Sequence, residues 1–147
     1  AGGPLAVIED ENRFPLAPYD AEHHRTARAA DGWLFAQVFA QLKQEFPGAR
    51  MLVRPPFGWG PLGWRWRAFG EDRDEYLKSI SAWPQGIEVA WSGARVEGAV
   101  LASGHHLAWW SGLAGRKPYL WQNFSGLDAH NAQQAYPTDA LDGLWQQ

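Results

Sequence analysis

Two adjacent carboxylates, Glu9 and Asp10, follow a short apolar run, Leu5-Ala6-Val7-Ile8, near the start of the chain. Two carboxyl groups at such close spacing do not both ionise easily, so one should hold a proton near neutral pH. A carboxylic acid in that state can donate a proton to a leaving group. Because Glu11 comes next, the pattern also fits a solvated acidic turn, and both interpretations stay open.

A second polar group lies near the other end of the chain. Trp121, Gln122 and Asn123 are followed by Asp128, five residues after Asn123. An aromatic ring beside an amide and a carboxylate could stack on a sugar ring and hold its hydroxyls. Asn and Asp are also common turn formers, so an ordinary loop is an equal alternative.

Tryptophan is abundant, with 10 residues in 147. Its flat apolar face and its N–H donor suit the C–H faces and hydroxyls of carbohydrates, although core packing explains the same abundance. Trp91-Ser92-Gly93 ends another apolar run, and Trp59 lies in a Gly- and Trp-rich loop. The hydroxyl and the exposed backbone of Trp91-Ser92-Gly93 could face a ligand, and a plain strand-terminating turn is an equal alternative.

The sequence favours neither a metal nor an organic cofactor. The histidines form two adjacent pairs, His23-His24 and His105-His106, and neighbours on a helix point about 100° apart. Neither pair has the spacing of a metal site, so we expect solvated side chains. Cysteine is absent, and the chain has no phosphate-binding glycine loop.

Short apolar runs with β character alternate with stretches of helical period, which predicts βα units and a parallel sheet. The predicted strands are Leu5–Ile8, Arg50–Arg54, Ile87–Trp91 and Pro118–Trp121. The predicted helices span about Ala21–Glu45, Asp72–Ala82 and part of Val96–Ala114.

Four such units make about half of a (β/α)8 barrel, since a whole barrel usually needs about 200–250 residues. We therefore expect residues 1–147 to form a single α/β domain that is a partial (β/α)8 (TIM) barrel. The polar and aromatic candidates cluster just after the strands, at the face where such barrels place their active sites.

Composition narrows the class of partner. A net charge of -3 and a pI near 5.9 give no basic field for nucleic acid or an anionic membrane. No apolar run reaches the roughly 18–20 residues that span a bilayer, and the first residues lack a signal-peptide pattern. We expect neither nucleic acid nor membrane as a partner; a cytoplasmic and a secreted bacterial location both stay open.

These residues together resemble the later part of the catalytic barrel of family-84 glycoside hydrolases, the O-GlcNAcases and bacterial hyaluronidase-like β-N-acetylglucosaminidases. That family has two aspartates after an apolar strand, a Trp-Thr-Gly that ends an I-x-V-x-W strand, and a W-x-N-x4-D loop after an R-x-P-x-x-W strand. The matching positions are Glu9-Asp10, Ile87–Gly93 with Ser92 for threonine, and Arg116, Pro118, Trp121, Asn123 and Asp128. After the second strand, Arg54–Gly58 stands in place of the family's Cys-Pro-Thr-x-Tyr.

The resemblance implies hydrolysis of β-linked N-acetylglucosamine, with retention, by a substrate-assisted mechanism. The acetamido oxygen of the substrate would attack the anomeric carbon, Glu9 would orient that group, and Asp10 would act as acid and base. A shift by one residue would make Asp10 and Glu11 the pair. The implied substrate-binding residues are Trp59, which replaces the family's tyrosine, and Trp91, Ser92, Trp121, Asn123 and Asp128.

Two alternatives accompany this hypothesis. The chain could be a non-catalytic carbohydrate-binding module that keeps the pocket without turnover. It could also be a half-barrel that forms a homodimer or joins a missing barrel half, because unpaired strand edges tend to associate. For the hydrolase and for the binding module, the partner is a carbohydrate or a glycoconjugate.

Overall fold

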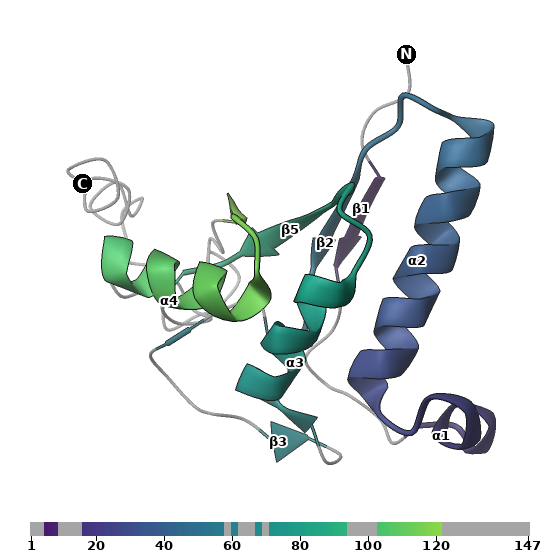
Figure 1. Cartoon of the computed structure of the whole chain (residues 1–147), viewed down its shortest axis with the longest axis horizontal. Coiled ribbons are helices and arrows are strands. Elements are labelled where there is room, and N and C mark those ends of the chain that lie inside the picture. Colours follow the sequence, from purple (N-terminus) through teal and green to yellow (C-terminus); the bar gives the residue numbers. More distant parts are fainter. Residues whose placement is uncertain are drawn as a thin grey trace, which may run out of the picture.

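A parallel sheet of four strands forms the centre of the molecule (Figure 1). The computed structural model describes residues 5–8, 16–57, 60–61, 67–68, 71–93 and 103–121. The sheet has the order β1 (Leu5–Ile8), β2 (Met51–Arg54), β5 (Ile87–Trp91) and β6 (Tyr119–Leu120). A separate antiparallel pair, β3 (Arg67–Ala68) and β4 (Glu71–Asp72), lies between β2 and β5 in the chain.

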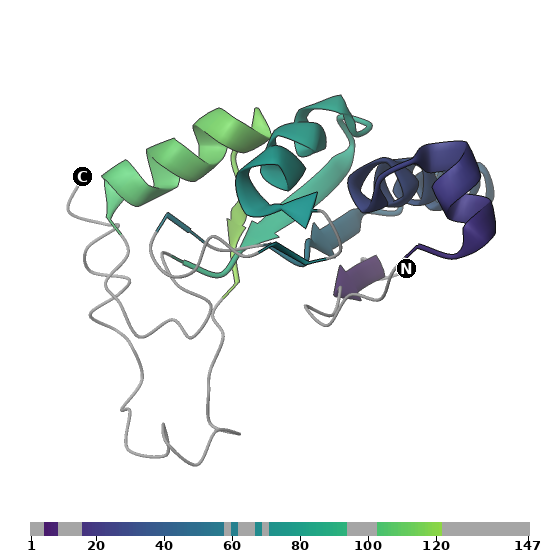
Figure 2. The same cartoon turned by 90° about the horizontal axis from the view of Figure 1, so that it is seen from below.

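Three helices, α2 (Ala27–Glu45), α3 (Arg73–Ser79) and α4 (Gly104–Ala114), and the short 3-10 helix η1 (Ile80–Ala82) cover one face of this sheet. The first helix, α1 (Pro18–His24), packs against α2. Figure 2 shows α2, α3 and α4 on the same side of the strands. Strand order follows chain order without reversal, so right-handed crossovers place these helices on that side. This arrangement is a section of a (β/α)8 barrel, because a doubly wound sheet reverses its order and carries helices on both faces.

The core lies between the sheet and the helices. Met51 and Val53 of β2 stand beside Ile87 and Val89 of β5, and all four side chains are at most 1% exposed. Phe35 of α2, Leu77 of α3 and Trp110 of α4 pack into the same cluster. Alternate strand residues therefore share the helix side, as the period of a β-strand requires.

The opposite face of the sheet is more polar at its amino end. Arg50 donates two hydrogen bonds of 2.8 Å to the Glu88 carboxylate and one of 2.8 Å to the Tyr119 hydroxyl. The hydrogen bond with Glu88 is the main reason that the pKa of Arg50 is raised. This trio links the amino ends of β2, β5 and β6, away from the edge where a barrel active site would lie.

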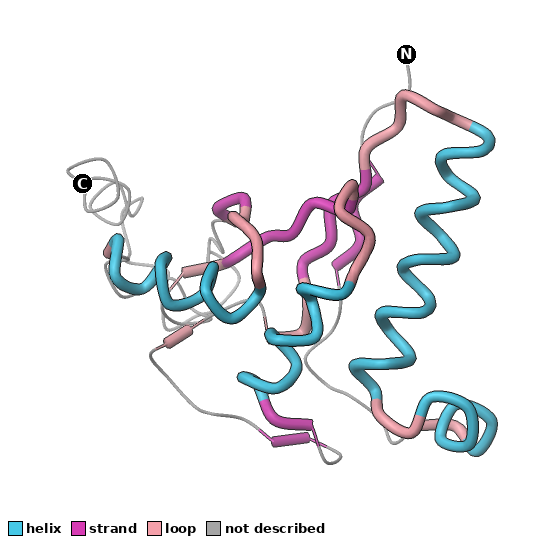
Figure 3. The backbone as a smooth tube through the Cα atoms, in the orientation of Figure 1, coloured by secondary structure: helices cyan, strands magenta, loops and turns pink. Residues whose placement is uncertain are grey.

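One predicted helix is divided in two. The pattern predicts a continuous helix over about Ala21–Glu45, whereas α1 and α2 are separate (Figure 3). Arg25 has a φ of 65°, which ends α1, and Thr26 starts α2 as its N-cap, its hydroxyl accepting from the Ala29 N–H at 3.3 Å. A threonine cap satisfies amide groups that a continuous helix would bond internally.

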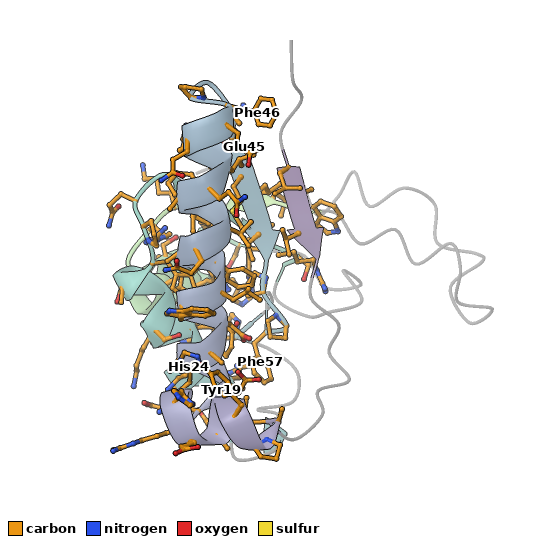
Figure 4. All side chains as sticks on the ribbon, turned by 90° about the vertical axis from the view of Figure 1, so that its right-hand side faces the viewer. Tyr19, His24, Glu45, Phe46 and Phe57 are labelled. Atoms are coloured by element: carbon orange, nitrogen blue, oxygen red, sulfur yellow. The ribbon has the colours of Figure 1, made fainter. Side chains whose placement is uncertain are left out.

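Only one side of α2 is buried. Trp33 and Leu34 are 54% and 47% exposed, whereas Phe35 is buried. Figure 4 looks onto the outer side of α2, with Tyr19 and His24 near its first turn and Phe46 at its far end. The helix therefore packs through Phe35, Val38, Phe39 and Leu42.

Candidate functional site

The carboxyl ends of the four strands meet at one edge of the sheet. Ile8 of β1 stands beside Arg54 of β2, and Trp91 of β5 stands beside Leu120 of β6. These strand ends therefore share the edge that is the catalytic face in a barrel. The candidate site consists of these strand ends and the described residues next to them.

The end of β6 presents Trp121. Its backbone N–H donates to the Trp91 carbonyl at 2.8 Å, which continues the pairing of β6 with β5 by one residue. By strand alternation Trp121 lies on the helix-free side, like Tyr119 two residues earlier. Its side chain is half-buried, so part of it is open to solvent at this edge.

The end of β5 is turned inward. Trp91 is 1% exposed, and its indole N–H donates to the Gly60 carbonyl at 3.2 Å. Ser92 is 3% exposed, and the Gly93 carbonyl accepts from the Gly60 N–H at 3.0 Å. Gly60 is thus bonded through its carbonyl to Trp91 of β5 and through its N–H to Gly93, so Trp91 helps to hold the loop that contains Gly60. Its predicted contact with a sugar stays a prediction.

Gly60 is also enclosed from the helix side. Its φ is 136°, and a Cβ atom there would lie 2.5 Å from the Trp109 ring of α4. Residues with side chains rarely adopt such a φ, so glycine is required by both conformation and space. Arg73 of α3 lies over the Trp109 ring at 5.0 Å and donates to the Pro61 carbonyl at 3.2 Å. Its Nε also pairs with Asp74 at 2.9 Å.

The loop after β2 begins in the core. Arg54 is 6% exposed and Phe57 is fully buried, with its ring edge-on to Tyr76 of α3 at 5.4 Å. The Tyr76 hydroxyl donates to Asp31 of α2 at 2.7 Å. The start of this loop is therefore held by α2 and α3 through Tyr76.

The described residues include three of the predicted site residues: Trp91, Ser92 and Trp121. The Trp121–Trp91 hydrogen bond brings the two strand ends that carry them together. The predicted acid and base and several binding residues, namely Glu9, Asp10, Trp59, Asn123 and Asp128, lie outside the described residues. Their roles stay predictions.

Gly60, Arg73 and Trp109 were not predicted from the sequence. They come from three separate parts of the chain, and no short motif links them. The only local signal was the Gly- and Trp-rich composition of the loop that contains Gly60. Their relation became visible only when α3 and α4 were placed beside the end of β5.

Two of the histidines have local roles. The His23 ring stacks on Tyr19 at 3.9 Å, and its Nδ1 lies 2.7 Å from the Tyr19 carbonyl. His106 and Ser103 form the capping box of α4. Within the described ranges, no three His, Cys, Asp or Glu residues gather as metal ligands. No helix in those ranges combines the length and apolarity that crossing a bilayer demands.

The chain resembles two solved structures. It matches a mutant of the Thermobaculum terrenum O-GlcNAc hydrolase with a TM-score of 0.73 and 18% identity, over 89% of this chain and 26% of that one. It matches CpGH84D with a TM-score of 0.56 and 18% identity, over 86% of this chain and 18% of that one. No family model and no curated protein sequence matches the chain.

At 18% identity these matches show the fold alone. Together with the parallel sheet, they confirm the predicted α/β class and its partial (β/α)8 architecture. The chain spans 26% and 18% of the lengths of the two proteins. Its likeness is therefore to a portion of a glycoside hydrolase fold.

Proposed function

We propose that this chain carries part of a carbohydrate site and acts on β-linked N-acetylglucosamine. The observation that carries the proposal is the edge where Trp91, Ser92 and Trp121 end β5 and extend β6, in a fold that resembles an O-GlcNAc hydrolase. In such barrels this edge is where substrates bind. A half-buried tryptophan at this edge suits the apolar face of a sugar ring.

The proposed reaction is substrate-assisted hydrolysis with retention. The acetamido oxygen of the substrate attacks the anomeric carbon while Asp10 protonates the departing glycosidic oxygen, so the C–O bond to the leaving group breaks. Glu9 orients the acetamido group. Asp10 then takes a proton from water while the water oxygen attacks the anomeric carbon, so the bond to the acetamido oxygen breaks and the acetamide is regenerated. In this scheme Asn123 and Asp128 hold ring hydroxyls, and Trp59 and Trp121 contact the ring.

Release of p-nitrophenol from p-nitrophenyl β-N-acetylglucosaminide tests the proposal. We expect slow turnover by the unmodified chain and a loss of about 100-fold or more in Asp10→Asn, because an amide cannot supply the proton. Asp20→Asn, on α1, is the matched control and should keep full activity. Equal rates in Asp10→Asn and the unmodified protein would refute the assigned role, and a folded protein without turnover would exclude hydrolysis by this chain alone.

A second candidate function is a half-barrel that associates through its open edge. Among the described residues β1 pairs with β2 alone, and Leu5 is 39% exposed. A strand edge of this kind presents backbone groups that can pair with another strand. In this case the carbohydrate site would be completed by a second copy or by the remainder of a barrel.

A further inference from the structure

We infer that Arg73 of α3 and Trp109 of α4 are positioning residues for the proposed carbohydrate site. They hold Gly60 and Pro61 against the end of β5, and through this contact they fix Ser92 and Trp121. The inference rests on the proposed function, because it names residues that determine how well that site binds its sugar. Neither residue belongs to the motifs that the sequence analysis identified.

The first step runs from the helices to the loop. Arg73 is 5% exposed, and its guanidinium lies 5.0 Å from the centre of the Trp109 ring while one N–H bonds the Pro61 carbonyl at 3.2 Å. The same Trp109 ring fills the space beside Gly60 so closely that a methyl group there would overlap it at 2.5 Å. The loop thus packs against a cation–π pair, in which the planar Arg73 guanidinium lies over the Trp109 ring and also bonds the loop backbone.

The second step runs from the loop to the strand end. The Gly60 N–H donates to the Gly93 carbonyl at 3.0 Å, and the Gly60 carbonyl accepts from the Trp91 indole at 3.2 Å. Ser92 lies between these two anchored residues in the chain. A displacement of Gly60 would therefore move both neighbours of Ser92, whose side chain is 3% exposed and has little space to adjust.

The third step reaches Trp121. Its backbone N–H donates to the carbonyl of Trp91, the residue whose indole bonds Gly60. A shift of the β5 end would therefore be transmitted to Trp121, a predicted sugar-binding residue that is half-buried. Small displacements of positioning groups can cost up to about 100-fold in function. The cation–π pair of Arg73 and Trp109 should therefore influence the affinity for the sugar although neither residue touches it.

The chain offers a matched control at the opposite end of the same strand. Arg116 is half-buried and donates to the carbonyls of Trp83, Pro84 and Ile87 at 2.8, 3.3 and 2.9 Å. Burial lowers its pKa. Like Arg73, it uses its guanidinium to hold backbone carbonyls, but at the amino end of β5. Substitution of either arginine should lower the general stability of the protein, whereas only substitution of Arg73 should affect the site.

The experiment compares Arg73→Lys with Arg116→Lys in the whole chain. Lysine keeps the charge but loses the planar, multidentate donor group. Binding of methyl β-N-acetylglucosaminide is measured by titration calorimetry at a temperature where thermal unfolding shows both variants to be folded. We expect Arg73→Lys to raise the Kd about tenfold and Arg116→Lys to leave it within twofold of the unmodified value.

A second variant covers the case in which Arg73→Lys does not fold. Trp109→Phe keeps an aromatic ring but removes the atoms that press on Gly60, and it should weaken binding in the same direction. Unchanged binding in both site variants would overturn the inference and leave the proposed function standing. If Arg116→Lys weakened sugar binding equally, the weaker binding would reflect a general loss of stability, and this result would also overturn the inference. No sugar binding by the unmodified chain would overturn the proposed function itself.

Discussion

At the scale of single residues, Gly60 is the most constrained position near the candidate site. It has a φ of 136°, it touches the Trp109 ring, and both of its backbone groups bond β5. The W-S-G motif therefore has a structural explanation that does not depend on a ligand: Trp91 and Gly93 form hydrogen bonds with the Gly60 backbone. This explanation is compatible with a role of Ser92 in binding.

Gly60→Ala should destabilise the protein by about 2–6 kcal/mol, because an unfavourable φ and overpacking each cost about 1–3 kcal/mol. Chemical denaturation measures the change. Gly48→Ala is the control, since no atom lies within 4 Å of the position where its Cβ would be, and it should change stability by less than about 1 kcal/mol. Similar midpoints for both variants would show that Trp109 can move aside at little cost.

At the scale of elements, helix ends carry much of the local information. α3 starts at Asp72, whose carboxylate accepts from the amides of Asp74 and Glu75. α4 starts with the capping box of Ser103 and His106 and ends at Gly115 in the left-handed conformation. These are local interactions, so they act wherever the helix lies in the molecule.

Substitution by alanine should change stability in opposite directions at two glycines, Gly112 within α4 and Gly115 at its C-cap. Gly112 is exposed within the helix with open space around it, so Gly112→Ala should stabilise the protein by about 0.5–1 kcal/mol. Gly115 has a φ of 67°, and its Cβ would lie 2.9 Å from Ser81, so Gly115→Ala should destabilise it by about 1–3 kcal/mol. Thermal unfolding of the pair checks both signs, and a stabilising Gly115→Ala would contradict the capping geometry.

At the scale of the whole molecule, the half-barrel candidate predicts that two copies associate through the edge of β1 that no described strand pairs with. We then expect a dimer mass by light scattering at micromolar concentration. The Leu5 N–H donates to the carbonyl of Arg50, the residue before β2, so the next N–H, that of Ala6, points away from β2. Ala6→Pro removes that outward donor and should shift the dimer toward monomer. A monomer at all concentrations would refute pairing through this edge.

The sequence by itself determined the local elements. Strands β1 and β5 were predicted at their observed bounds, because short apolar runs bounded by polar, Pro or Gly residues have few other ways to bury themselves. The parallel class followed from alternating strands and helices. The break at Arg25 was missed because no proline or glycine stands there, and only Thr26, a favoured N-cap residue, marks the division.

The tertiary structure decided which distant residues act together. Arg73, Trp109 and Gly60 are related by packing, and packing depends on how α3 and α4 rest on the sheet. Strand periodicity already placed Trp91 on the same face as Val89, but only the assembled core shows which face the helices cover and that its indole supports a loop. Local propensity acts over a few residues, whereas burial and long-range hydrogen bonds depend on the complete arrangement of elements.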